Sequence, residues 1–164
     1  MITNTGAHRT RLQASKMRQS IRDSLIGTWR LVSYQAQDAQ GKISNPLGKN
    51  LAGLLCYTND GFMSMQVMRE DRPGYSSGDL YISPMEEMAA AGGVYVAYAG
   101  RFSVDEAATT VTHHVELSSS PTWVGTDQTR TVALRAGRLY LDGGFVKISG
   151  TLQAPQTVWE KAPS

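Results

Sequence analysis

Two adjacent histidines, His113 and His114, are the residues whose type best suits chemistry near neutral pH. An imidazole titrates close to neutrality, so it can act as a general base or exchange hydrogen bonds with a bound molecule. Both lie in segment 110–118, where apolar and polar residues alternate as in a strand with one buried face. His113 shares its face with Val111 and Val115, so we expect it to point inward and His114 to point to solvent.

This geometry argues against a metal site at the histidine pair. Neighbours on a strand project to opposite faces and cannot chelate one ion, and the remaining histidine, His8, and the lone Cys56 are remote in sequence. We therefore predict no metal. His113 either contacts a bound molecule or is a core histidine that bonds to a neighbouring hydroxyl or backbone group.

Two further polar side chains are expected inside the fold. Tyr98 alternates with Val96 in segment 94–104, and Arg130 shares its parity with Val132. A guanidinium on an inward face needs a partner. Arg130 either covers Trp29 through a cation–π contact or holds a carboxylate or enolate of a ligand. If the protein is an enzyme, His113, Tyr98 and Arg130 are the candidate catalytic residues.

The candidate ligand contacts are aromatic and thioether side chains near these groups. Flexible thioethers adapt to irregular apolar ligands, although ordinary core packing explains them equally well. Trp123, in the loop 121–127, is either a residue of the cavity mouth or an anchor of that loop. The predicted contacts are Tyr57, Met63, Met65, Phe102, Trp123 and Tyr140.

Short strands must position these residues. The 164-residue chain is 41% hydrophobic, with 16 Gly and 6 Pro between short apolar runs, a pattern that favours an all-β domain over a helical bundle. Asn59-Asp60-Gly61 predicts a hairpin. In the first strand, Trp29, Leu31 and Ser33 are expected on one face and Tyr34 on the other. The eight predicted strands cover 27–37, 50–58, 62–69, 94–104, 110–118, 128–135, 138–141 and 151–161, an antiparallel up-and-down meander that closes into a barrel.

A long excursion interrupts the meander. Residues 70–83 are rich in Gly, Ser, Asp and Pro, and a short helix over 84–91 is predicted to follow, with Ser83 as its N-cap and Gly92-Gly93 at its end. Such an insertion is expected to cover the mouth of the barrel.

The charge distribution divides the chain into a lead-in segment, 1–24, and a barrel domain, 25–164. The lead-in carries five basic residues against Asp23, so the remainder has 11 basic and 13 acidic residues despite a net charge of +2. A mildly acidic body argues against a nucleic-acid partner. The lead-in is either a helical or disordered approach to the domain or a mitochondrial-type presequence.

The single cysteine excludes an intramolecular disulfide and favours a reducing, cytoplasmic location. No apolar run approaches the length of a membrane-spanning helix, so no membrane span is predicted. A catalytic Cys–His pair and a phosphate-binding glycine loop are also lacking, so no cofactor is expected.

Several motifs resemble one family. They are Leu25-Ile26-Gly27-Thr28-Trp29, Asn45-Pro46-Leu47-Gly48, Tyr57-Thr58-Asn59-Asp60-Gly61-Phe62, Ala97-Tyr98-Ala99-Gly100-Arg101-Phe102, His113-His114-Val115-Glu116 and Trp123-Val124-Gly125-Thr126-Asp127. In this order they resemble the bacterial and fungal lipocalin-like domain proteins over about residues 25–160. The resemblance implies a calycin-type barrel with an internal cavity. It also implies binding of small apolar molecules or, for relatives in secondary-metabolite pathways, cyclase or isomerase activity.

Two main functions follow from these observations. The first is a binding module that holds a small hydrophobic metabolite in the barrel. The second is a cofactor-free cyclase or isomerase for a polyketide- or terpenoid-type substrate, because a cavity can accelerate ring closure by shape alone. A structural domain with a filled core is a third alternative, and a homodimer through exposed strand edges is compatible with each.

Overall fold

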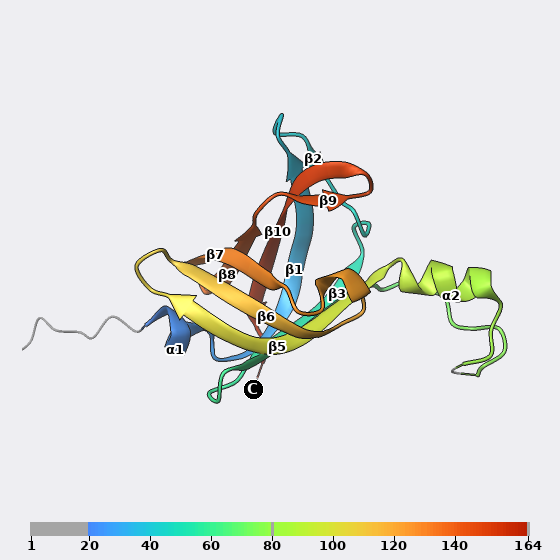
Figure 1. The fold of residues 1–164 in the computed structure, drawn as a ribbon, viewed down its shortest axis with the longest axis horizontal. Coiled ribbons are helices and arrows are strands. Elements are labelled where there is room, and N and C mark those ends of the chain that lie inside the picture. Colours follow the sequence, from blue (N-terminus) through green and yellow to red (C-terminus); the bar gives the residue numbers. More distant parts are fainter. Residues whose placement is uncertain (1–19, 80, 164) are drawn as a thin grey trace, which may run out of the picture.

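Eight antiparallel strands form a closed barrel in the computed structural model, which describes residues 20–79 and 81–163 (Figure 1). Hydrogen bonds between the first and last of these strands close the sheet. The predicted meander is therefore confirmed. The barrel strands, in spatial order, are β1 (Gly27–Asp38), β3 (Leu51–Tyr57), β4 (Phe62–Arg69), β5 (Tyr95–Asp105), β6 (Thr110–Ser118), β7 (Asp127–Arg135), β8 (Arg138–Gly143) and β10 (Thr151–Lys161).

Two short strands extend the sheet at one end of the barrel. β2 (Ile43–Ser44) pairs with the end of β1, and β9 (Val146–Ile148) pairs with the start of β10. Neither was predicted, because two or three residues are too few to show an alternating pattern.

Irregular pairing at two points bends the strands. The β1–β10 register shifts between Leu31 and Ser33, and the β5–β6 register shifts between Ala99 and Gly100. A Cβ added at Gly100 would lie 2.0 Å from the carbonyl oxygen of His114, so only glycine fits this close approach. Shifts of this kind increase the local twist and help a sheet to curl.

A short helix, α1 (Ile21–Leu25), packs against one end of the barrel (Figure 1). The Ser20 hydroxyl caps it by accepting a hydrogen bond from the Asp23 N–H at 3.0 Å. Leu25 is fully buried, and its carbonyl accepts a 2.8 Å hydrogen bond from the Trp29 indole. This end of the barrel is therefore filled.

The helix α1 includes residues 21–24, the end of the expected lead-in segment. Residues 1–19 lie outside the described part of the chain, but Ile21 packs against the barrel core and Glu106 accepts hydrogen bonds from the Ile21 and Arg22 N–H groups. The structure is therefore helical over 21–25.

The partner of Trp29 also differs from expectation. The Lys161 ammonium lies 4.1 Å from the centre of the Trp29 ring. The hypothesis that Arg130 covers Trp29 is therefore wrong, because β10 pairs with β1 and sets Lys161 opposite Trp29.

The predicted inserted helix is present as α2 (Met85–Gly92), with Pro84 rather than Ser83 at the N-cap. The Ser83 hydroxyl instead hydrogen-bonds to that of Ser77. The helix extends away from the barrel, and only Gly92 and Gly93 reach the cavity (Figure 1). The expectation that this helix covers the mouth is therefore wrong.

Truncating Leu25 tests the filled end. Leu25→Ala removes a fully buried side chain, so we expect the free energy of unfolding to fall by about 2–4 kcal/mol in urea denaturation. Leu117→Ala, at a position that is 71% exposed, is the matched control and should change it by less than about 0.5 kcal/mol. Equal effects of the two substitutions would contradict the packing of α1.

Candidate ligand-binding site

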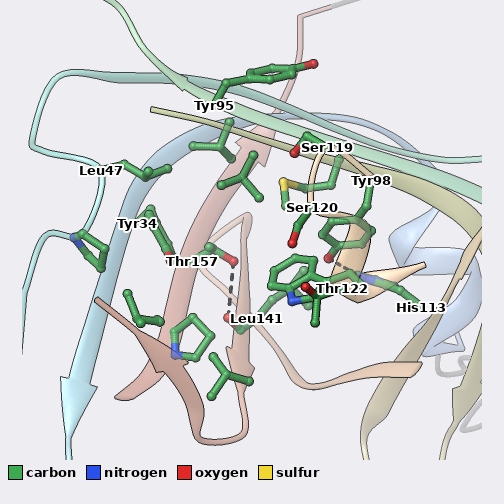
Figure 2. A pocket seen from close by; sticks show the side chains of 18 of the residues that line it. Tyr34, Leu47, Tyr95, Tyr98, His113, Ser119, Ser120, Thr122, Leu141 and Thr157 are labelled. Carbon is green, nitrogen blue, oxygen red and sulfur yellow. Dashed lines mark hydrogen bonds between the residues drawn. The ribbon is translucent and has the colours of Figure 1, made fainter. Parts of the chain in front are cut away.

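A cavity of about 720 Å³ occupies the end of the barrel opposite α1 (Figure 2). Apolar and aromatic side chains dominate its wall, among them Leu47, Leu55, Met65, Val67, Leu141 and Trp159. The mouth is formed by Pro46 and Leu47, by Ser119–Trp123 and by Val146–Ser149, all of which belong to connections or short elements rather than to long barrel strands. The volume is within the range typical of small-molecule sites.

A chain of hydrogen bonds runs from the core to this cavity. The Tyr57 hydroxyl lies 2.7 Å from His113 Nε2, and the Tyr98 hydroxyl lies 2.8 Å from His113 Nδ1. The three side chains come from β3, β6 and β5. Tyr98 and His113 line the cavity, whereas Tyr57 lies outside the lining and is only 2% exposed. Tyr98 is thus the hydroxyl of this hydrogen-bond network that reaches the cavity wall.

The imidazole of His113 is neutral at physiological pH. Burial, together with the smaller effects of the nearby Arg130 and His114 charges, lowers the pKa of His113 to about 3. A neutral imidazole has one N–H donor and one acceptor nitrogen, so one phenol donates to His113 and the other accepts from it. The predicted inward orientation of His113 is confirmed, since it is 1% exposed.

Tyr57 and Tyr98, the two phenols that hydrogen-bond to His113, are held in their protonated form. Burial raises the pKa of Tyr57 well above its ordinary value, with Tyr98 adding to the effect and the Arg130 charge opposing it. Burial likewise raises the pKa of Tyr98 against the opposing Arg130 charge. Both side chains therefore act as hydrogen-bond donors and acceptors rather than as bases.

Arg130, on β7, contributes a cation to the cavity wall. Its guanidinium donates to the Thr129 carbonyl at 3.1 Å and to Gln128 Oε1 at 3.4 Å. Both acceptors are neutral, and the three ion pairs among the described residues do not involve Arg130.

The structure divides the other predicted ligand contacts into two groups. Met65 and Trp123 line the cavity, and the Trp123 ring meets Tyr98 edge-on with ring centres 5.5 Å apart. Met63 and Phe102 are buried in the core outside the cavity wall, together with Tyr57.

The prediction for Tyr140 is wrong. Its neighbours Leu139 and Leu141 are buried, so alternation turns Tyr140 to the other face, where Arg135 lies 5.8 Å from its ring centre.

Sequence reasoning missed Tyr34, Thr157 and Trp159, which also line the cavity. Regular alternation puts Tyr34 on the face opposite Trp29, but the register shift between Leu31 and Ser33 reverses the alternation and turns Tyr34 inward. The Trp159 indole donates to the Thr157 hydroxyl at 2.8 Å. The alternating apolar residues of the last strand were the available signal for Trp159.

His114 lies on the outer face, as predicted, within an arrangement that resembles a hydrolase triad. Ser103 Oγ lies 2.9 Å from His114 Nε2, and Asp127 Oδ1 lies 2.7 Å from His114 Nδ1. These residues stand on adjacent strands whose backbone N–H groups are used in the sheet, and none of them lines the cavity. We interpret the arrangement as cross-strand stabilisation on the outer face of the barrel.

The segment Gly74-Tyr75-Ser76-Ser77-Gly78 matches the G-x-S-x-G pattern of a nucleophile elbow. Such an elbow requires a strand before the serine and a helix directly after it. Here the segment forms turns between β4 and α2, and the Ser76 N–H donates to Glu87. The match is therefore a coincidence of sequence.

Residues 20–79 and 81–163 lack two features that would indicate other functions. They contain no group of three or more His, Cys, Asp or Glu side chains that could hold a metal ion. They also contain no helix with the length and apolar character needed to cross a membrane.

Comparison with known proteins establishes the family. The lipocalin-like domain model matches residues 26–162, and the chain belongs to this family. It is 39% identical over 108 residues to the 4'-hydroxy-3'-methoxypropiophenone carrier protein ppsC of Aspergillus oryzae, an alignment that covers 62% of this chain and 97% of that protein.

Solved structures with similar folds come from two Bacteroides species. A lipocalin-like protein from Bacteroides uniformis is 15% identical, with a TM-score of 0.42 over 85% of this chain and 99% of the other. An uncharacterized protein from Bacteroides eggerthii is 13% identical, with a TM-score of 0.43 over 84% and 99%.

The buried neutral His113 makes stability depend on pH. Its folded pKa, about 3, lies below the unfolded value of 6.5, so the unfolded state binds more protons between these values and stability falls as the pH falls through them. We expect the free energy of unfolding to drop by about 2 kcal/mol between pH 7 and pH 5, a range above the ordinary pKa values of the carboxyl groups.

Urea denaturation at pH 7, 6 and 5 measures this drop. His113→Gln keeps an amide that can bond to both phenols but cannot be protonated, so its stability should change less over this range. A wild-type slope in His113→Gln would contradict the assignment.

Proposed function

We propose that this protein binds and carries one small aromatic metabolite in the barrel cavity. The observation that carries the proposal is a 720 Å³ cavity that is largely apolar and aromatic but contains a few converging polar groups, Tyr98, His113 and Arg130. Apolar walls supply most of the affinity in such sites, and the few polar groups fix the orientation of the ligand.

An aryl ketone fits this wall. Trp123 and Trp159 offer flat apolar surfaces to a ring, and the Tyr98 hydroxyl can donate to a carbonyl or phenol oxygen. The similarity to a protein named as a carrier of a hydroxylated, methoxylated propiophenone supports this ligand class.

The hydrogen-bond chain favours binding over catalysis. If Tyr98 gave its proton to a substrate, His113 would replace that proton and Tyr57 would in turn donate to His113. The result would be a buried phenolate at Tyr57, where burial raises the pKa well above its ordinary value. Net proton transfer is therefore costly, whereas a hydrogen bond to the ligand leaves the chain neutral.

Three further inferences from the sequence remain predictions. They are the cytoplasmic location, the homodimer and the division of the chain after residue 24.

Fluorescence titration with 4'-hydroxy-3'-methoxypropiophenone tests the proposal, because Trp123 and Trp159 line the cavity. We expect saturable quenching with one site per chain. Tyr98→Phe removes one hydrogen bond and should weaken binding roughly 2- to 10-fold. Tyr140→Phe, which removes a hydroxyl from the outer face, is the matched control and should bind as the wild type does. The absence of saturable quenching would overturn the proposal.

A cofactor-free isomerase or cyclase is the second candidate, because the Tyr57–His113–Tyr98 chain reaches the cavity wall. Enolisation is the elementary step it would have to promote. In D₂O, NMR follows deuterium exchange at the carbon next to the carbonyl of the same ketone. We expect the exchange rate to equal that of buffer. A faster exchange that Tyr98→Phe abolishes would favour the enzyme instead.

A further inference from the structure

We infer that the cavity takes its ligand as an organic monoanion, whose negatively charged oxygen lies against the Arg130 guanidinium and the Tyr98 hydroxyl. This inference rests on the proposed function and specifies the charge state of the ligand. The class is an aromatic molecule with one acidic oxygen, in the form of a phenolate, enolate or carboxylate.

The charges around the cavity are the first argument. Its wall contains two basic side chains, Arg130 and Lys147, and no Asp or Glu. His113 adds no charge, because its pKa is about 3. The site is therefore positive, although residues 25–164 as a whole have more acidic than basic side chains. Low-dielectric walls strengthen the attraction of such a site for an anion.

The incomplete pairing of Arg130 is the second argument. Its two hydrogen-bond acceptors are a backbone carbonyl and an amide oxygen, and no carboxylate among the described residues lies within ion-pair distance. A partly buried cation that meets only neutral acceptors is incompletely compensated. The planar guanidinium matches an acidic oxygen, or the two oxygens of a carboxylate, in the cavity beside it.

The direction of the hydrogen-bond chain is the third argument. With Nδ1–H donating to Tyr98 and Tyr57 donating to Nε2, the proton of Tyr98 is free for the cavity. An anionic oxygen can only accept hydrogen bonds, so it selects this arrangement. The hydrogen-bonding groups of Tyr57, His113 and Tyr98 then all have partners. The ligand oxygen accepts one hydrogen bond from the neutral Tyr98 hydroxyl and one from the charged Arg130 guanidinium.

A pair of fluorescent probes that differ by one charge tests the inference. The anion 8-anilinonaphthalene-1-sulfonate and the neutral N-phenyl-1-naphthylamine share one ring system. We expect the wild type to bind the anion more tightly. Arg130→Gln should weaken binding of the anion by at least about 10-fold and of the neutral probe by less than about 2-fold.

Two further variants and a competing ligand show whether the probes bind in the cavity and whether the charge effect is specific to Arg130. Arg135→Gln removes an exposed cation from the same strand and should change neither affinity. Met65→Trp fills part of the cavity and should weaken both probes, with circular dichroism to confirm folding. Displacement of both probes by 4'-hydroxy-3'-methoxypropiophenone would show that they occupy the proposed site.

The outcomes separate the two proposals. If both probes bind in the cavity but the neutral probe binds as tightly as the anion, or if Arg130→Gln weakens both equally, the inferred anion site is wrong and the binding function stands. If neither probe nor the ketone binds, both proposals fail.

Ultraviolet absorption of the bound phenol gives an independent measurement. The phenolate of 4'-hydroxy-3'-methoxypropiophenone absorbs at longer wavelength than the phenol, so a pH titration reports its ionisation. We expect the bound phenol to ionise at a pH lower by about one unit or more than the free compound, and Arg130→Gln to abolish that shift. If the phenol bound to the wild type ionised at the same pH as the free compound, or at a higher pH, the inference would be overturned.

Discussion

The pairing of β1 with β10 is the constraint on which the site depends. It joins residues near both ends of the described chain, from Trp29 opposite Lys161 to Asp38 opposite Gln153. Without it the sheet would have two open edges, and Tyr34 on β1 would not lie beside Thr157, its partner on β10, in the cavity wall. A closed barrel of eight strands is just wide enough to hold either packed side chains or one small ligand.

The two ends of this barrel differ, because side chains fill the interior at one end and a cavity occupies the other. Around α1, the cluster of Leu25, Trp29, Tyr57 and Phe102 fills the interior and supplies apolar burial. At the other end the largely apolar and aromatic side chains of the wall enclose a cavity of about 720 Å³ instead of meeting in a packed core. His113 lies between these regions. It joins Tyr57 in the packed half to Tyr98 in the hollow half, so the polar floor of the cavity is positioned by the core.

Alternation along single strands predicted much of this arrangement and failed at identifiable places. It gave the eight barrel strands and the inward direction of His113 and Tyr98, because buried and less buried residues alternate regularly from Tyr98 to Phe102 in β5 and from Val111 to Val115 in β6. It misplaced Tyr34, because the register shift after Leu31 depends on pairing with β10, which local sequence does not contain. Alternation also could not distinguish residues of the cavity wall from residues of the packed core. Met63 and Met65 share one face of β4, yet only Met65 reaches the cavity, since depth along the barrel is set by the other seven strands.

Arg130 shows why a ligand site need not be optimal for stability. An apolar side chain at this position would cover the wall without an incompletely compensated cation, and a carboxylate beside it would pair with it permanently. The structure has neither, and Gly143 keeps the adjacent space open, since a Cβ there would lie 3.0 Å from the Arg130 guanidinium. A partly buried cation that donates to two neutral acceptors and pairs with no carboxylate of the described residues costs stability in the empty barrel. A ligand of the inferred class would bring the missing negative charge and offset that cost, which would couple occupancy of the cavity to the stability of the fold.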